Sequence, residues 1–254
     1  MIKSDDATTL PLLYHLNSEP WMNVDAYTAT LAEVPIPVRV PREHCVMLPY
    51  AAGPGPVAQA LAARRSCRRY AARVLGAQVL SGLLAGAYGV LPTSAQGEER
   101  VVLRRPVPSA GALYPLELYA CLARVEGVPD GVYRYQPLHH RLEPVRQAPT
   151  GAELDELLLA QAYVAQANVL LFVAAGLGRT LDKYGPRGYR YLLLEGGHVV
   201  QALCLLAHEH GLASLCIGGF RDSRVNRWLG LDGVHQAVIY AAAIGWADDA
   251  SSPA

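Results

Sequence analysis

Several segments of this sequence combine residue types that can bind an anion, cradle a flat ligand or move a proton. The first is residues 64–70, which read Arg-Arg-Ser-Cys-Arg-Arg-Tyr. Guanidinium groups pair with phosphate oxygens through two parallel hydrogen bonds, and a serine hydroxyl adds a further donor. The segment therefore predicts a phosphate site, and the alternative is a solvated basic surface.

Two other segments are rich in small residues at places where a ligand could meet the backbone. Residues 108–115 read Pro-Ser-Ala-Gly-Ala-Leu-Tyr-Pro, and residues 211–220 end a predicted strand in Gly218 and Gly219. Small residues between prolines let the backbone approach a flat ligand in a fixed shape. Glycines at a strand end expose backbone N–H groups. The alternative for each segment is an ordinary turn.

A fourth segment, residues 183–191, reads Lys-Tyr-Gly-Pro-Arg-Gly-Tyr-Arg-Tyr. We expect a loop here, between a buried strand and a long helix, where functional residues are common. A free tyrosine has a pKa near 10, and an adjacent ammonium favours the phenolate. Lys183 and Tyr184 could therefore supply a base near neutral pH. The alternative is a polar loop with aromatic anchors.

Other chemistries find less support in the sequence. The run Gly176-Leu177-Gly178 lacks the third glycine of a dinucleotide fingerprint, and no P-loop is present. We expect no metal site, because the histidines are not spaced as ligands on one helix face and the five cysteines form no C-x-x-C pair. The cysteines are expected to be reduced and mostly buried. Glu195 and His198 follow Tyr184 as candidates for the base.

The elements that position these segments follow from hydrophobic periodicity and turn residues. Helices are expected over 57–63, 76–88, 152–166, 189–210 and 223–229. Strands are expected over 115–125, 132–135, 141–145, 168–175, 214–217 and 236–244, and a polar loop over 93–100. Because helices and strands mix without strict alternation, we predict an α+β fold with one sheet wrapped by helices.

Bulk properties limit the function further. The 254 residues carry a formal net charge of zero and a pI of 7.1, which gives no reason to expect nucleic acid as a partner. Residues 1–6 lack a signal-peptide pattern, and the longest apolar run, 167–178, is shorter than the roughly 20 residues of a membrane span. We therefore expect a cytoplasmic protein without membrane contact.

We divide the chain into three parts. Residues 1–57, rich in Pro and Gly towards their end, are expected to form an irregular N-terminal extension. Residues 58–246 form the ligand-binding domain, and residues 247–254 form a short C-terminal tail.

Taken together, the four segments resemble the nitroreductase superfamily, in its SagB-like branch of thiazole/oxazole (azoline) dehydrogenases of microcin-type peptide synthetase complexes. The resemblance runs from about Arg64 to Gly245, and its most specific string is residues 108–115. Residues 14–18, Tyr-His-Leu-Asn-Ser, are also similar to a short segment of this branch. The resemblance implies a nitroreductase-like fold, with a mostly antiparallel sheet wrapped by helices, in a two-fold homodimer.

The same resemblance implies FMN as cofactor and assigns its contacts. The phosphate and ribityl chain would be held by Arg64, Arg65, Ser66 and Arg68. The isoalloxazine ring would lie near Gly218 and Gly219. At the subunit boundary, the ring would also lie against Pro108, Ser109, Ala110, Gly111 and Leu113. Lys183 and Tyr184 would be the catalytic pair, with Tyr184 as base and Lys183 as its activator, or the reverse. The sequence departs from the pattern of simple nitroreductases, which often bring a basic residue near the C-terminus to the phosphate, because no Lys or Arg follows Gly245. Either Arg221, Arg224 or Arg227 takes the place of that residue, or fewer groups contact the phosphate.

The expected reaction oxidises thiazoline or oxazoline rings of a modified peptide to thiazole or oxazole, and dioxygen reoxidises the flavin. One hydrogen leaves the ring as a proton and the other as a hydride. The expected partners are the azoline-containing peptide and a second copy of the chain, and the need for a bound cyclodehydratase complex is left open. A generic NAD(P)H-dependent FMN nitro or quinone reductase is one alternative, and the Lys183–Tyr184 pair argues against it. A flavin-free docking subunit is another, and the arginine cluster argues against that.

Overall fold

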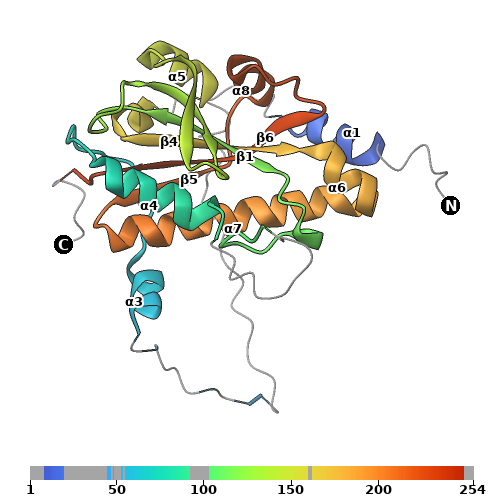
Figure 1. The fold of residues 1–254 in the computed structure, drawn as a ribbon, viewed down its shortest axis with the longest axis horizontal. Helices are drawn as coiled ribbons and strands as arrows, with labels where there is room; N and C mark the ends of the chain where they lie inside the picture. Colours follow the sequence, from blue (N-terminus) through green and yellow to red (C-terminus); the bar gives the residue numbers. More distant parts are fainter. Residues whose placement is uncertain are drawn as a thin grey trace.

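A six-stranded sheet forms the centre of the molecule (Figure 1). The computed structural model describes residues 9–19, 45, 46, 48, 53, 55–91, 103–159 and 162–248. The strands are β1 (Leu116–Leu122), β2 (Gly131–Gln136), β3 (Arg141–Gln147), β4 (Val169–Gly176), β5 (Ala213–Ile217) and β6 (Gln236–Gly245). Their order is β3-β2-β1-β4-β6-β5, and every neighbouring pair is antiparallel, as predicted.

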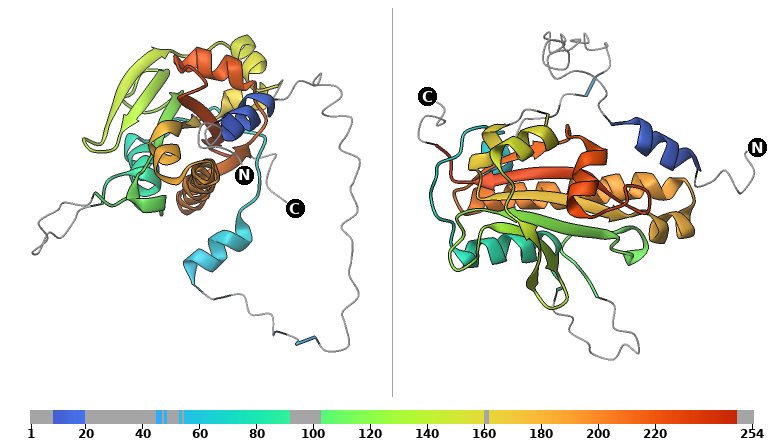
Figure 2. Two further views of the ribbon diagram at one scale, coloured as in Figure 1. Left: turned by 90° about the vertical axis from the view of Figure 1, so that its right-hand side faces the viewer. Right: turned by 90° about the horizontal axis from the view of Figure 1, so that it is seen from above.

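Helices cover both faces of this sheet. On one face lie α4 (Ala77–Tyr88) and α7 (Arg187–Glu209), and on the other lie α5 (Gly151–Leu157), the 3-10 turn η3 (Ala162–Gln166) and α8 (Asp222–Leu229). The left view of Figure 2 shows α7 end-on below the sheet, with α5 and α8 above it. Side chains of β1 alternate between the two cores, as the pleat of a strand requires.

The central strand β4 is buried on both faces, and its sequence, VLLFVAAG, is accordingly a continuous apolar run. It pairs with β1 on one side and with β6 on the other. At its end the chain passes directly into α6 (Leu177–Tyr184). This junction brings the segment around Lys183 to one end of the sheet.

The long helix α7 is the main core helix. It is long and apolar enough to cross a membrane by length and composition, but its buried side packs against the sheet and α4. Two glycines allow close approach. A Cβ on Gly188 would lie 2.6 Å from the carbonyl oxygen of Thr180 in α6, and one on Gly196 would lie 3.1 Å from Ile239 Cδ1 in β6.

Most predicted elements are confirmed, with ends shifted by at most three residues. The helix predicted over 152–166 is wrong as a single element, because it is interrupted near Leu159, whose φ of 55° is incompatible with a right-handed helix. The expectation that residues 1–57 are irregular is wrong for α1 (Thr9–Asn17). There, buried His15 contacts the Tyr189 hydroxyl at 2.9 Å. The loop predicted over 93–100 lies outside the described residues.

Candidate functional site

Lys183 and Tyr184 converge on the backbone of Gly111. A Cβ built on Gly111 would lie 2.5 Å from Lys183 Nζ and 2.5 Å from the Tyr184 hydroxyl oxygen. Lys183 Nζ also lies 5.3 Å from the centre of the Tyr184 ring. The structure therefore joins two segments that lie far apart in sequence, the predicted catalytic pair and the predicted ring-contacting residues 108–113.

The pair does not lie in a loop, as we expected, but in the last turn of α6. Gly185 ends this helix with a φ of 56°, and Pro186 precedes α7. Tyr184 is half-buried and packs edge-on against Tyr191, with ring centres 5.1 Å apart. A helix end fixed by a following helix holds the two side chains more firmly than a loop would.

The segment from Ser109 to Tyr114 is folded back on itself in a strained shape. Gly111, Ala112 and Tyr114 have φ values of 61°, 53° and 47°, and a positive φ is costly for the latter two. The Ser109 hydroxyl accepts a hydrogen bond from the Tyr114 N–H at 2.9 Å. Arg179, one turn before Lys183, donates to the Leu113 carbonyl at 3.1 Å. The first hydrogen bond closes the segment on itself, and the second attaches it to α6.

The buried carboxyl group of Glu195, in α7, supports the segment from Ser109 to Tyr114. Tyr88 in α4 donates to Glu195 Oε1 in α7 at 2.7 Å, and its oxygen accepts from the Leu116 N–H at 3.1 Å. Burial raises the pKa of Glu195, while hydrogen bonds from Ser109 and Tyr88 and the charge of Arg105 oppose that rise. Glu195 thus contacts Ser109, one of the predicted flavin residues.

The predicted phosphate residues lie at the opposite end of the sheet. α3 (Pro56–Ala63) ends at half-buried Arg64, and the following chain runs beside β5. Ser66 pairs with Ser214, and the Cys67 N–H donates to the Ser214 carbonyl at 3.0 Å. Arg65, Ser66 and Arg68 are exposed. Gly218, directly after β5, is exposed, and a Cβ there would meet open space.

The two groups are thus anchored at opposite ends of β6. The arginine segment runs beside β5, whose Ala213 pairs with Gly245 of β6. The predicted catalytic pair follows β4, whose last residue, Gly176, pairs with Gln236 at the other end of β6. Ten residues of strand span about 30 Å. Figure 1 shows α3 near one end of α7 and α6 near the other.

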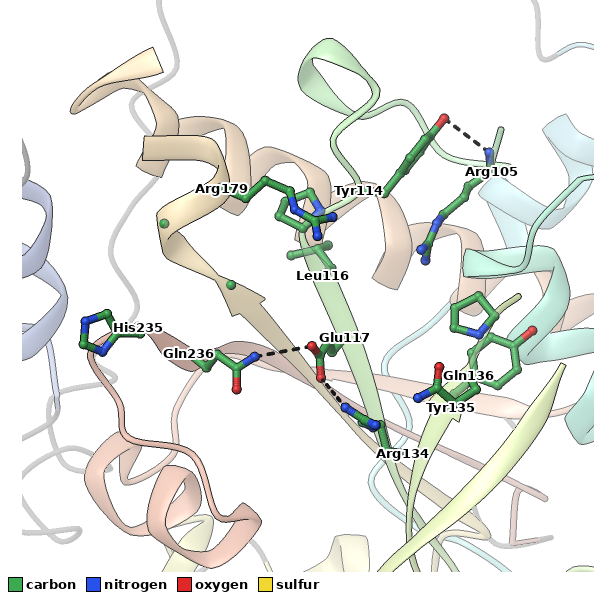
Figure 3. Close-up of a pocket in the computed structure, with 14 residues that line it drawn as sticks. Arg105, Tyr114, Leu116, Glu117, Arg134, Tyr135, Gln136, Arg179, His235 and Gln236 are labelled. Atoms are coloured by element: carbon green, nitrogen blue, oxygen red, sulfur yellow. Dashed lines mark hydrogen bonds and ion pairs between the residues drawn. The ribbon is translucent and has the colours of Figure 1, made fainter. Parts of the chain in front are cut away.

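A polar pocket of about 370 Å³ opens beside the strained segment. Figure 3 shows its lining, which includes Tyr114, Arg105, Arg179 and Glu117. Glu117 is held by Arg134 at 3.6 Å and by the Gln236 amide at 3.4 Å. The Tyr114 hydroxyl accepts from the backbone N–H of Arg105 at 3.2 Å.

Sequence reasoning missed Arg105, Arg179 and Tyr88. Only the spacing of Arg179 and Lys183, four residues apart on one helix face, could have suggested a shared role. Of the three arginines considered for the missing C-terminal cation, Arg224 forms an ion pair with Glu156 in α5. Among the described residues, no group of three or more His, Cys, Asp or Glu could hold a metal ion.

The cysteines differ from expectation. Cys121 and Cys204 are buried and Cys67 is half-buried, but Cys45 and Cys216 are exposed, so the prediction that most are buried is wrong. Cys204 and Cys216 also lie in contact across α7 and β5.

The chain is similar in sequence and in fold to several known proteins. The profile of the nitroreductase family matches residues 61–246. A Methanocaldococcus jannaschii protein named as a nitroreductase is 40% identical over 166 residues, which are 65% of this chain and 80% of that protein. The microcin B17-processing protein McbC of Escherichia coli is 36% identical over 140 residues, which are 51% of this chain and 50% of McbC. In the solved E. coli microcin synthetase McbBCD complex with truncated pro-MccB17 bound, one chain has the same fold, with a TM-score of 0.72 and 22% identity over 97% of this chain and 95% of that chain.

Proposed function

Because the chain belongs to the nitroreductase family, we propose that it is an FMN-dependent dehydrogenase that oxidises thiazoline or oxazoline rings of a modified peptide to thiazole or oxazole. The observation that carries the proposal is the convergence of Lys183 and Tyr184 on Gly111. The similarity to McbC, a microcin-processing protein, supports a peptide as substrate.

The residues present fit FMN. Arg64, Arg65, Ser66 and Arg68 supply cationic and hydroxyl donors for a phosphate, and the open space at Gly218 lets a flat ring approach the backbone. Gly218 and Gly219 would face the ring from β5, and residues 108–111 with Leu113 would cover it. When bound, FMN would accept a hydride from the azoline ring and be reoxidised by dioxygen.

The pair beside Gly111 would remove the ring proton. Both side chains reach the backbone of the proposed ring-contacting segment, and we assign Tyr184 as the base because a lysine ammonium has no lone pair with which to accept a proton. Lys183 would stabilise the negative charge on that oxygen, and its Nζ also lies at Gly111. Arg179 and Ser109 would keep the segment in place through their hydrogen bonds to Leu113 and Tyr114.

A second copy of the chain would complete the site. The arginine segment and the catalytic pair are anchored at opposite ends of β6, so one protomer would supply the phosphate residues and its partner the pair. Two surfaces support an interface: α3 buries none of its residues, and Leu193 and Leu194 of α7 are 40% and 54% exposed. We therefore propose a two-fold homodimer. Light scattering that shows an active, FMN-containing monomer would overturn this assembly.

We further propose a cytoplasmic protein that acts on its peptide after a cyclodehydratase has formed the rings. The fold shared with a chain of the McbBCD complex supports such a partnership. Co-purification of the chain with its cyclodehydratase, with and without the cyclised peptide, tests whether the partner must remain bound.

Mass spectrometry of a cyclised peptide tests the function directly. Incubation with the FMN-loaded protein in air, without NAD(P)H, should remove two hydrogens from each azoline ring. A reaction that requires NAD(P)H and leaves the peptide mass unchanged would instead identify a nitro or quinone reductase. A purified protein that is colourless and does not bind added FMN would indicate a docking subunit.

A further inference from the structure

Two thiols lie in contact at the edge of the sheet where the arginine segment runs. Cys204 is buried in α7, and Cys216 is exposed in β5. Their sulfur atoms are 3.7 Å apart, and both are free thiols. A disulfide requires a separation of about 2 Å, so the two sulfur atoms would have to approach by less than about 2 Å to form the bond. Cys67, in the neighbouring segment, donates instead to the Arg69 carbonyl at 3.0 Å.

The surroundings of the two sulfur atoms differ. Hydrogen bonds from the Cys204 thiol and the Tyr240 hydroxyl, together with the positive charge of Arg64, outweigh the opposing effect of burial and lower the pKa of Cys216. Cys204 donates to Cys216 and is buried, and both effects raise the pKa of Cys204. Cys216, which is exposed whereas Cys204 is buried, is therefore the thiol of the pair that a peroxide reaches first, and its lowered pKa favours the nucleophilic thiolate form.

We propose that Cys204 and Cys216 form a peroxide-reactive pair that closes to an intramolecular disulfide between α7 and β5. The oxidant is a hydroperoxide. The Cys216 thiolate attacks one oxygen of hydrogen peroxide, so an S–O bond forms, the O–O bond breaks and hydroxide leaves. The Cys204 thiol then attacks the Cys216 sulfur, so the S–S bond forms and water leaves. Both thiols are oxidised, and one peroxide is reduced to one water and one hydroxide, which takes a proton from the solvent to become the second water.

A disulfide between Cys204 and Cys216 would lie next to the proposed phosphate site. Cys216 is two residues before Gly218, and Ser214 of the same strand pairs with Ser66. The disulfide would fix β5 to α7 and remove the thiolate charge beside Arg64. The pair would thus be a redox-sensitive element next to the proposed phosphate site. The thiol chemistry itself needs only added peroxide and does not rest on the proposed function.

Peptide mapping of the full-length protein tests the proposal. The folded, fully reduced protein is treated with hydrogen peroxide and digested without reductant. We expect a crosslink between the peptides that contain Cys204 and Cys216, a loss of two hydrogens from the intact mass, and reversal by dithiothreitol. In Cys204→Ser, the crosslink should disappear, and Cys216 should be trapped as a sulfenic acid by a 1,3-dione reagent.

Substitutions of two other cysteines serve as controls for the Cys204–Cys216 crosslink. Cys67→Ser removes the half-buried thiol of the adjacent segment and should leave the crosslink unchanged, as should Cys45→Ser. Loss of the crosslink in Cys67→Ser, or peroxide treatment that oxidises Cys45 while Cys204 and Cys216 stay reduced in the wild-type protein, would overturn the proposal. The wild-type map decides this even where a Cys204 variant fails to fold.

Discussion

Gly111 leaves open the space in which the Tyr184 hydroxyl lies. A Cβ at position 111 would be 2.5 Å from that oxygen, closer than nonbonded atoms approach. The φ of 61° at Gly111 also favours glycine. The glycine of the small-residue segment therefore makes room for the proposed catalytic pair as well as for the backbone turn.

Gly111→Ala should displace the Lys183 and Tyr184 side chains and strongly reduce azoline oxidation. The positive φ alone should cost about 1–2 kcal/mol of stability. Gly127→Ala is a matched control, because Gly127 has a φ of 69° but a Cβ there meets open space. Both variants should lose similar stability in chemical denaturation, and only Gly111→Ala should lose activity. If the two variants were equally active, the contact of Gly111 with Lys183 and Tyr184 would have no role in the reaction.

Tyr184→Phe removes the proposed base and keeps the ring that packs against Tyr191. A general base contributes about 10²–10⁴-fold in rate, so ring oxidation should fall at least about 100-fold with FMN content unchanged. Lys183→Ala should cause a comparable loss, and the double variant should be scarcely worse, because the two groups act as one unit. Single-turnover peptide oxidation, followed by mass spectrometry, measures these rates.

Tyr191→Phe is the control for this pair of variants. Its ring meets the Tyr184 ring edge-on at 5.1 Å, so it tests removal of a neighbouring hydroxyl without removal of the base. We expect nearly wild-type oxidation. A large loss in Tyr191→Phe with retained activity in Tyr184→Phe would move the base to Tyr191. Dithionite reduction of the flavin should be unaffected in all variants, because that reaction needs no enzyme base.

Arg64→Ala combined with Arg68→Ala should weaken FMN binding. Hydrogen bonds to charged groups contribute about 1.5–3 kcal/mol each, so the Kd should rise by at least about 100-fold. Arg69→Ala removes one positive charge from the same segment, outside the predicted phosphate residues, and should retain the flavin. Fluorescence titration with FMN measures both. A double variant that purifies fully yellow would contradict the phosphate assignment.

The sequence allowed the strands and most helices to be predicted because apolar periodicity and turn residues are local signals. Residue types in the sequence also marked the four segments that we propose form the flavin and catalytic sites. The sequence did not indicate that Gly111 meets Lys183, or that Cys204 meets Cys216, because these contacts depend on how α6, α7 and β5 are arranged around the sheet. The helical position of Lys183 was missed because Gly185 and Pro186 read as a loop, whereas they separate two helices.

Glu195 offers a test of pH dependence. Burial raises the pKa of Glu195 above its ordinary value of 4.5, so the native state binds this proton more tightly than the unfolded state does. The wild-type protein should therefore lose stability as pH rises from about 4.5 through the raised pKa, and the loss should be constant above it. Glu195→Gln keeps the size of the side chain and cannot ionise. The variant should gain stability relative to wild type between pH 4.5 and neutral pH, which urea unfolding at both values measures.

The same variant separates a supporting role from a catalytic one. Glu195 contacts Ser109 and Tyr88, and a glutamine can keep both contacts and hold the strained segment in place. The rate of ring oxidation should therefore fall much less in Glu195→Gln than the loss of about 100-fold that is expected when a base is removed. Tyr88→Phe is the more damaging change, because it leaves the buried Leu116 N–H without its acceptor, at a cost of about 1–3 kcal/mol. A loss of about 100-fold or more in Glu195→Gln, at unchanged stability and FMN content, would make Glu195 the base. The Tyr184 hydroxyl, which lies against Gly111, would then position the ring.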